Sequence, residues 1–96
     1  MIASFGDRTT ADLFHGRMTA SVRRMPADVR DAACRKLDMI NSAWLLDDLK
    51  MPPGNRLEAL KGDLAGKHSI RVNKQWRIIF RWHQNTAHEV MFVDYH

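Results

Sequence analysis

Residues 68–82 read HSIRVNKQWRIIFRW, and the alternation in this stretch decides the fold class. Apolar and polar side chains alternate over 68–72 and again over 76–82, which is typical of strands with one buried face. Asn73-Lys74-Gln75 lies between the two runs and predicts a hairpin turn. The side chains expected to face inward are Ile70, Val72, Trp76, Ile78, Phe80 and Trp82.

Further strands extend this hairpin into an antiparallel meander. Leu57 to Leu60 is a predicted strand before it, and a turn around Asn85-Thr86 leads to a last predicted strand from Glu89 to Tyr95. Met1 to Phe5 is apolar at alternate positions and predicts an edge strand. We therefore expect a sheet of three to five strands.

The clearest predicted helix runs from about Pro26 to Ala43, and proline suits its first turn. Apolar residues recur there at helical spacing and form one stripe: Val29, Ala33, Leu37, Ile40 and Trp44. A shorter helical segment is expected from Trp44 to Leu49. Met51-Pro52-Pro53-Gly54-Asn55 then ends all helical structure.

The N-terminal region adds one more short helix. Asp7 or Thr10 is expected to cap it, and it carries Leu13 and Phe14, whereas residues 18–25 show no clear period and are predicted to be a loop. The pattern as a whole predicts an α+β fold in a single domain of residues 1–96, with N-terminal helices packed on one face of an antiparallel sheet. The other face of the sheet is expected to be uncovered.

Positive charge gathers in the second half of the chain. The sequence has 15 Lys and Arg against 11 Asp and Glu, with a formal net charge of +4. Between Arg56 and Arg81, both included, seven basic residues are opposed only by Glu58 and Asp63. Such a field attracts phosphate backbones without reading their sequence, so we expect a nucleic acid as partner.

Several other classes of function are disfavoured. Cys34 is alone, so we expect no disulfide, and its position offers no base that would make it a nucleophile. The histidines lack metal-ligand spacing, and we expect neither a metal nor a cofactor. Apolar stretches are too short to cross a bilayer and no signal peptide is seen, so the expected location is the cytoplasm. The three tryptophans lie on apolar stripes and are expected in the core: Trp44, Trp76 and Trp82.

Two arginines are the main candidates for phosphate binding. Arg71 and Arg77 are expected to stand outward on neighbouring strands, where two like charges repel unless an anion lies between them. A guanidinium holds phosphate oxygens in a bidentate fork, which favours Arg77. Lys61 follows a strand in a turn, and a fixed ammonium there would stabilise developing negative charge, although a solvated turn lysine is the simpler interpretation.

The chain ends on Asp94-Tyr95-His96, directly after an apolar strand. These side chains offer a carboxylate, a phenol and an imidazole, all of which transfer or orient protons. Strand alternation places Asp94 and His96 on one face and Tyr95 on the other. The terminus would therefore need a twist or bend to direct all three at one phosphate.

Four segments together resemble the HigB toxins of the RelE/ParE superfamily, the plasmid maintenance killer proteins. They are PGNRLEALKGD at 53–63, HSIRVN at 68–73, QWRIIF at 75–80 and VDYH at 93–96. The opening MIASF at 1–5 matches as well, so the resemblance spans nearly the whole chain. Each motif is weak alone, but their order and the Asp-Tyr-His ending make the match specific.

The resemblance implies a RelE-like fold and a toxin of a type II toxin–antitoxin system. It further implies a metal-free, ribosome-dependent endoribonuclease, in which the 2′-hydroxyl of the RNA attacks the adjacent phosphate. The implied catalytic residues are Lys61, Arg77, Asp94, Tyr95 and His96, and the implied substrate-binding residues are Arg71, Glu58 and Lys74. The implied partners are the ribosome with its mRNA, a HigA-like helix-turn-helix antitoxin, and operator DNA mainly through that antitoxin.

The chain departs from the family at one position. Some HigB proteins have a histidine three residues before the lysine, where this chain has Glu58. Glu58 either replaces that histidine as a base or simply holds Lys61. Two alternatives to a ribonuclease also remain at this stage: a ParE-like toxin that inhibits gyrase, and a non-catalytic basic module that binds RNA.

Overall fold

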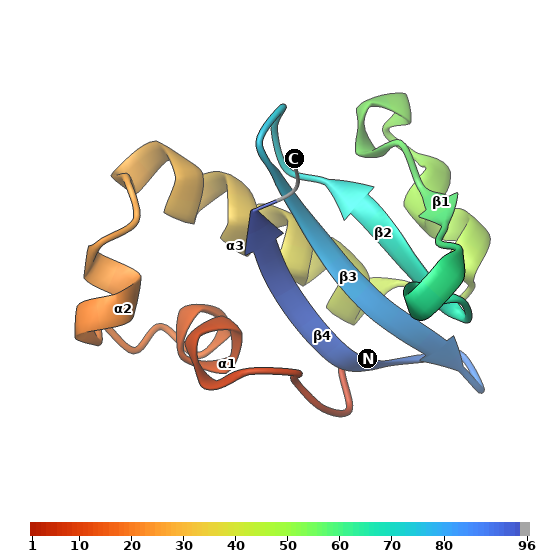
Figure 1. Ribbon diagram of the computed structural model, residues 1–96, viewed down its shortest axis with the longest axis horizontal. Coiled ribbons are helices and arrows are strands. Elements are labelled where there is room, and N and C mark those ends of the chain that lie inside the picture. The colour runs from red at the N-terminus through yellow and green to blue at the C-terminus, as the bar shows by residue number, and fades with distance from the viewer. Residues whose placement is uncertain (95–96) are drawn as a thin grey trace.

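The computed structural model of the chain describes residues 1–94, and Figure 1 shows its layers. Three α-helices come first: α1 (Arg8–Phe14), α2 (Ala20–Arg23) and α3 (Ala27–Ser42). Two short 3-10 helices follow, η1 (Leu46–Lys50) and η2 (Pro53–Asn55). The rest of the chain consists of β1 (Glu58–Ala59), the 3-10 helix η3 (Gly62–Leu64), β2 (Lys67–Arg71), β3 (Trp76–His83) and β4 (Thr86–Asp94). The predicted α+β class is confirmed.

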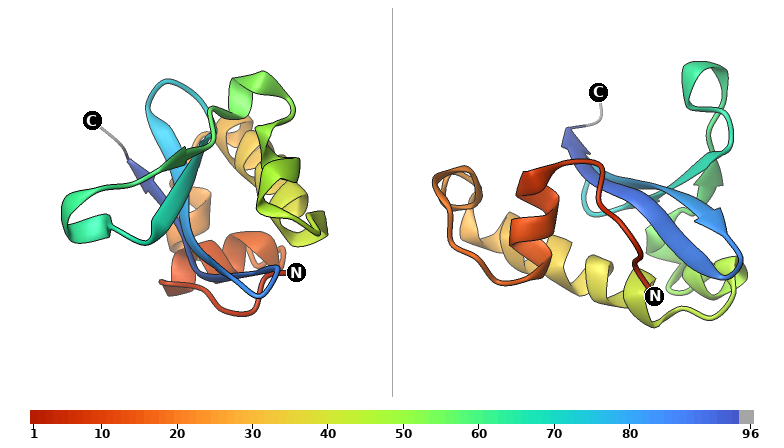
Figure 2. Two further views of the ribbon diagram at one scale, coloured as in Figure 1. Left: turned by 90° about the vertical axis from the view of Figure 1, so that its right-hand side faces the viewer. Right: turned by 90° about the horizontal axis from the view of Figure 1, so that it is seen from below.

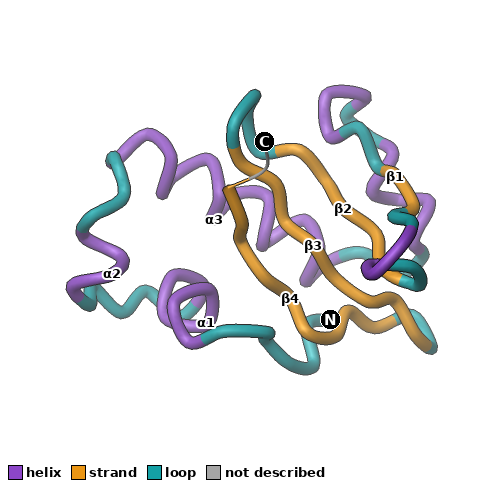
Figure 3. Tube along the Cα trace, viewed as in Figure 1, coloured by secondary structure: helices purple, strands orange, loops and turns teal. Residues whose placement is uncertain are grey.

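The four strands form one antiparallel sheet in the order β1-β2-β3-β4 (Figure 3). The turn between β2 and β3 is held by the Asn73 side chain, whose Oδ1 accepts hydrogen bonds from the backbone N–H groups of Gln75 and Trp76, both at 2.8 Å. Gln84 and Asn85 both have positive φ, as the tight two-residue turns of hairpins require. Because this turn is so short, β4 begins at Thr86 rather than at the predicted Glu89.

Helix α3 crosses one face of the sheet (Figure 1) and supplies four of the fourteen buried core residues within 1–94. Its stripe residues Leu37 and Ile40 are fully buried, as are Ile78 and Phe80 on β3. Burying each large apolar side chain stabilises the fold by about 1.5–3 kcal/mol. The predicted helix and the predicted inward positions of the hairpin are thus confirmed, and Trp76 and Trp82 pack against this core as expected.

The N-terminal segment closes the free edge of β4. Ile2 and Phe5 make isolated parallel bridges to Ala87 and Val90, so this segment pairs with the sheet as predicted, but without forming a continuous strand. Further along, the buried hydroxyl of Thr10 accepts a hydrogen bond of 2.9 Å from the backbone N–H of Phe92. Helix α1 therefore protects the edge of β4 from pairing with another chain.

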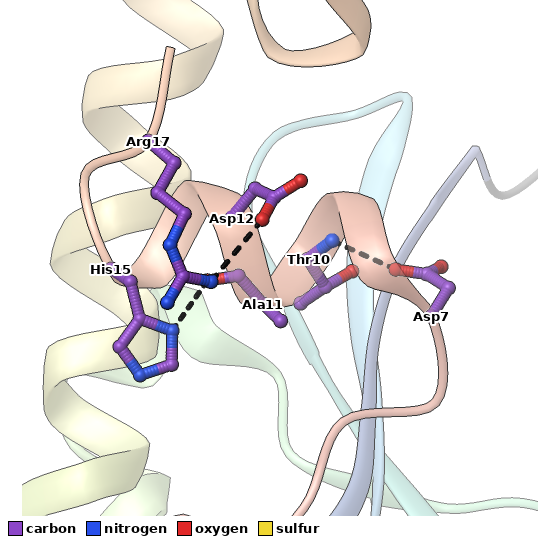
Figure 4. A network of polar contacts seen from close by, with 6 residues as sticks. All are labelled: Asp7, Thr10, Ala11, Asp12, His15 and Arg17. Atoms are coloured by element: carbon purple, nitrogen blue, oxygen red, sulfur yellow. Dashed lines mark hydrogen bonds and ion pairs between the residues drawn. The ribbon is translucent and has the colours of Figure 1, made fainter. Parts of the chain in front are cut away.

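Side chains at both ends of α1 hold this helix in place (Figure 4). Asp7 caps it, because its carboxylate accepts a hydrogen bond of 2.8 Å from the backbone N–H of Thr10. Beyond the last turn, the guanidinium of Arg17 lies 3.4 Å from the carboxylate of Asp12. The first contact satisfies a backbone N–H that the start of the helix would otherwise leave unpaired, and the second ties the chain after the helix back to it.

Three local predictions are wrong. Residues 51–55 do not end all helical structure, since the 3-10 helices η2 and η3 form within and after them. Residues 18–25 are not all loop, since α2 forms there and buries Val22 against the core. Trp44 is not in the core but is 80% exposed, because α3 ends at Ser42 and the chain turns outward. Leu49, on η1, is buried further along in its place. In residues 1–94, no helix is long and apolar enough to cross a membrane.

Candidate active site

The sheet face opposite α3 is the open face predicted to bind phosphate (Figure 2). Glu58 on β1 lies opposite Ser69 on β2, and Arg71 on β2 lies directly opposite Arg77 on β3. Residues opposite one another on antiparallel strands share a face. The predicted neighbourhood of the two arginines is therefore confirmed, and Val93 on β4 continues their row.

Arg77 is buried, contrary to the expected exposed position. Its exposure is only 8%, because three groups surround the guanidinium. The Nε atom donates to the Ser69 hydroxyl at 2.9 Å, and Nη2 donates to the Arg56 carbonyl oxygen at 2.8 Å. The same Nη2 lies 3.0 Å from Oε1 of Glu58. These contacts hold the guanidinium in one orientation before any ligand arrives.

The carbonyl that binds Arg77 depends on an unusual backbone conformation. Arg56 follows η2 with φ 46° and ψ 54°, the left-handed region that non-glycine residues rarely adopt. This conformation lies directly before the segment that leads into β1. The sequence could not predict that the Arg56 carbonyl and Ser69 accept hydrogen bonds from Arg77. Every residue has a backbone carbonyl, and a single serine in a strand follows no distinctive pattern.

Glu58 contacts Arg77 rather than Lys61, so the expectation that it simply holds Lys61 is wrong, and its role as a base stays a prediction. Its carboxylate lies at the edge of the sheet, and its side chain is 52% exposed. The repulsion expected between Arg71 and Arg77 is thus relieved inside the protein by Glu58. Because the pair is half exposed, its contribution to stability is smaller than that of a fully buried pair.

Lys61 lies on the loop just after β1, three residues beyond Glu58. It precedes η3 and is exposed, and its ammonium makes no hydrogen bond or ion pair with a residue among 1–94. Its ammonium is therefore open to a ligand at the β1 side of the open face. The contact of Lys61 with a phosphate stays a prediction.

The remaining described candidates lie at the end of the sheet where β2 turns into β3. Arg71 is half-buried, and Lys74 is exposed in the turn. Asp94 is opposite Trp76 across β3 and β4, and its Oδ2 accepts a hydrogen bond of 3.2 Å from Gln75. Because Asp94 is paired with Trp76, strand alternation places it on the face of the sheet opposite to Arg77. Tyr95 and His96 lie outside the described residues.

Three other residues that could take part in chemistry, Arg81, Glu89 and Cys34, have contacts or surroundings that explain them as parts of the fold. Arg81 is exposed on β3, and its Nε donates to the Glu89 carboxylate at 2.9 Å. The hydrogen bond from Arg81, with help from nearby Lys67, lowers the pKa of the Glu89 carboxyl. Burial, followed by nearby acidic side chains, raises the pKa of the Cys34 thiol, which disfavours the reactive thiolate.

This arrangement suits chemistry on a phosphate ester. A rigid guanidinium supplies a fixed positive charge, and lysine and arginine side chains nearby add to it. A carboxylate beside the guanidinium is an acceptor for a proton. Within residues 1–94 no three His, Cys, Asp or Glu side chains gather closely enough to hold a metal ion.

Comparison with solved structures first defines the class of fold. The chain superposes on YoeB–YefM complex structures from Staphylococcus aureus, and in one of them the TM-score is 0.63 at 14% identity, covering 100% of this chain and 98% of that chain. At this identity the likeness shows the fold alone. It confirms the RelE-like architecture that the resemblance implied.

Sequence comparison then defines the family. A family model described as the RelE-like toxin HigB of type II toxin–antitoxin systems matches residues 4–96, and the chain belongs to this family. Its relatives include Toxin HigB-1 of Vibrio cholerae, 48% identical over 65 residues and 68% of each chain. Endoribonuclease HigB of Proteus vulgaris is 33% identical over 96 residues and 100% of both chains. The predicted HigB-type toxin is confirmed, and an antitoxin is its partner.

Proposed function

We propose that this toxin is an endoribonuclease that cuts mRNA during translation. The single observation that carries the proposal is the buried Arg77, which Ser69, the Arg56 carbonyl and Glu58 hold in one orientation on the open basic face. Membership of the HigB family and the name of the Proteus vulgaris relative support the same activity.

The proposed reaction uses the RNA as its own nucleophile. A base takes the proton of the 2′-hydroxyl, whose oxygen then attacks the adjacent phosphorus, and the bond from phosphorus to the 5′-oxygen breaks. An acid donates a proton to that leaving oxygen. The products are a 2′,3′-cyclic phosphate and a 5′-hydroxyl, so no oxidant, metal or added water enters this step.

The residues divide these tasks by charge and position. Arg77 and Lys61 stabilise the negative charge that develops on the phosphate, while Arg71 and Lys74 bind the flanking backbone. Glu58 is the described carboxylate nearest to the Arg77 guanidinium, so it is well placed to accept the 2′-hydroxyl proton. Asp94, Tyr95 and His96 share orientation and proton transfer at the leaving oxygen.

The proposal includes where and with whom the toxin acts. The ribosome presents the mRNA in the decoding site, and the domain of residues 1–96 acts in the cytoplasm. The antitoxin is a HigA-like helix-turn-helix protein, through which the pair binds operator DNA.

Primer extension on mRNA from cells that express the toxin tests the activity. We expect cuts within translated codons that disappear when translation is blocked, and 2′,3′-cyclic ends on the upstream fragments. Removal of His96 is expected to abolish toxicity while the fold is retained. Intact mRNA together with trapped gyrase would contradict the proposal and favour a ParE-like toxin, and bound but uncut RNA would favour a non-catalytic module.

A further inference from the structure

Arg56 has a backbone conformation that its side chain does not favour. Its φ of 46° and ψ of 54° lie in the left-handed region, where the Cβ atom crowds the following carbonyl oxygen. The other non-glycine residues of 1–94 with positive φ, Gln84, Asn85 and Glu89, lie in the β3–β4 hairpin. A chain that takes this conformation after a helix usually has glycine or asparagine there. An outlier of this kind indicates a role for the backbone itself.

The hydrogen bonds of Arg56 come from its main chain and not from its guanidinium. Its N–H donates to the Pro53 carbonyl oxygen at 3.1 Å, and its own carbonyl oxygen accepts from Nη2 of Arg77 at 2.8 Å. The side chain is exposed, and its guanidinium makes no hydrogen bond or ion pair with a residue among 1–94. The contribution of Arg56 to the candidate site is therefore a carbonyl group in a fixed orientation.

The segments on both sides of Arg56 are anchored to the fold. Asn55 is fully buried, and its Oδ1 accepts a hydrogen bond of 2.6 Å from Nζ of Lys36 on α3. On the other side, Glu58 pairs with Ser69 where β1 joins the sheet. The Arg56 carbonyl therefore keeps its place relative to both α3 and the sheet.

A main-chain carbonyl suits this task because its charge does not change during the proposed reaction. Nη2 of Arg77 contacts both this carbonyl and Oε1 of Glu58, the latter at 3.0 Å. When Glu58 accepts the proton of the 2′-hydroxyl it becomes neutral, and its attraction to the guanidinium weakens. The carbonyl oxygen is an acceptor in both states. It therefore holds Arg77 in place at the moment when Glu58 no longer does so.

We propose that Arg56 is a positioning residue, whose left-handed main chain, and not its guanidinium, keeps Arg77 directed at the scissile phosphate while Glu58 changes its charge. This role rests on the proposed ribonuclease function. An exposed arginine on a basic face would otherwise be taken for one more ligand of the RNA backbone. The two roles differ in the step that they affect, because a positioning residue changes kcat and a ligand of the backbone changes KM.

Two substitutions of Arg56 separate its main chain from its side chain. Arg56→Asn and Arg56→Val both remove the guanidinium, but asparagine adopts the left-handed conformation readily and a β-branched residue does not. We expect Arg56→Asn to keep the wild-type kcat for cleavage of mRNA on ribosomes. Arg56→Val is expected to lower kcat by about tenfold to 100-fold with KM unchanged, because a small displacement of Arg77 has an effect of this size. Arg23→Asn, at an exposed arginine of α2, is the matched control for the lost charge.

A measurement on Arg77 itself distinguishes positioning from a general loss of stability. Protons held in an internal hydrogen bond exchange slowly with water. By nuclear magnetic resonance of the free toxin, the Nη2 protons of Arg77 are expected to exchange slowly in wild type and Arg56→Asn, and faster in Arg56→Val. The melting temperature is measured alongside. If Arg56→Val does not fold, Arg56→Ala replaces it, since alanine also disfavours positive φ.

Three results would overturn the proposal. The first is an equal loss of kcat in Arg56→Asn and Arg56→Val, and the second is a wild-type kcat in Arg56→Val. The third is a higher KM in Arg56→Asn with a salt dependence of RNA binding lower by about one unit of slope, which would make the side chain a phosphate ligand. If the wild-type toxin does not cut mRNA, the ribonuclease function fails, and the exchange of the Arg77 protons alone decides whether Arg56 positions that residue.

Discussion

Arg77 and Trp44 reverse the usual distribution of residue types, and they do so at opposite ends of the molecule. The arginine is buried on the open face of the sheet, and the tryptophan is exposed beyond the end of α3. The arginine is buried because Glu58, Ser69 and the Arg56 carbonyl satisfy it. The tryptophan is exposed because nothing in residues 1–94 covers it. Buried charge and exposed aromatic rings are both costly, so each residue is a candidate for a role beyond folding.

Arg77→Ala is expected to have the largest effect. It removes the fixed guanidinium from the phosphate site, so cleavage of a model mRNA on ribosomes is expected to fall by about 100-fold or more. It also leaves Ser69 and the Arg56 carbonyl without their partner, at a cost of about 1–3 kcal/mol in unfolding free energy. Arg81→Ala, on the same strand, is the control and is expected to keep its cleavage rate. If Arg77→Ala cut RNA at the wild-type rate, the open face of the sheet would not be the site of cleavage.

Glu58→Gln is expected to have the next largest effect. This variant tests proton transfer by Glu58 separately from its contact with Arg77. The amide still accepts a hydrogen bond from Arg77 but is a poor base, so cleavage is expected to fall by about 100-fold with little change in stability. Asp63→Asn changes an exposed acid nearby and is expected to be neutral. A Glu58→Gln variant that cuts as fast as wild type would show that Glu58 only holds Arg77.

Asn55→Ala tests the segment between the end of α3, near Trp44, and β1, which carries Glu58. Asn55 is fully buried, accepts a hydrogen bond of 2.6 Å from Lys36 on α3 and donates to the carbonyls of Leu49 and Met51. Its loss is expected to lower the unfolding free energy by about 1–3 kcal/mol, measured in urea. Asn41→Ala alters an exposed asparagine and is expected to cost less. Equal losses from the two variants would contradict a special role for Asn55.

Trp44→Ala is expected to have the smallest effect on the isolated toxin. The side chain is already in water, so the unfolding free energy is expected to change by no more than about 0.5 kcal/mol. Trp82→Ala, whose ring packs against the core, is the comparison and is expected to cost about 3 kcal/mol or more. A large loss of stability in Trp44→Ala would mean that the ring supports the fold.

Much of the fold followed from local patterns, and the failures have physical causes. The helix over Pro26 to Ala43 and the hairpin were predictable because their apolar periods are long and agree with their turn residues. The missed helix α2 has only four residues, too few to show a period. Of the site, the pairing of Arg71 with Arg77 was predictable from alternation, whereas the burial of Arg77 depends on groups eight and more residues away.

Patterns along the chain were enough to predict the α+β class, the basic open face and the resemblance to HigB toxins, because alternation, charge and motif order can be read without knowing which segments meet. The pairing of Glu58 with Arg77 and the exposure of Trp44 could be seen only in the folded chain. Both outcomes depend on where separate segments meet after folding. Alternation along the chain predicts on which face of the sheet a side chain lies. Whether that side chain is buried depends on which other segments pack against that face.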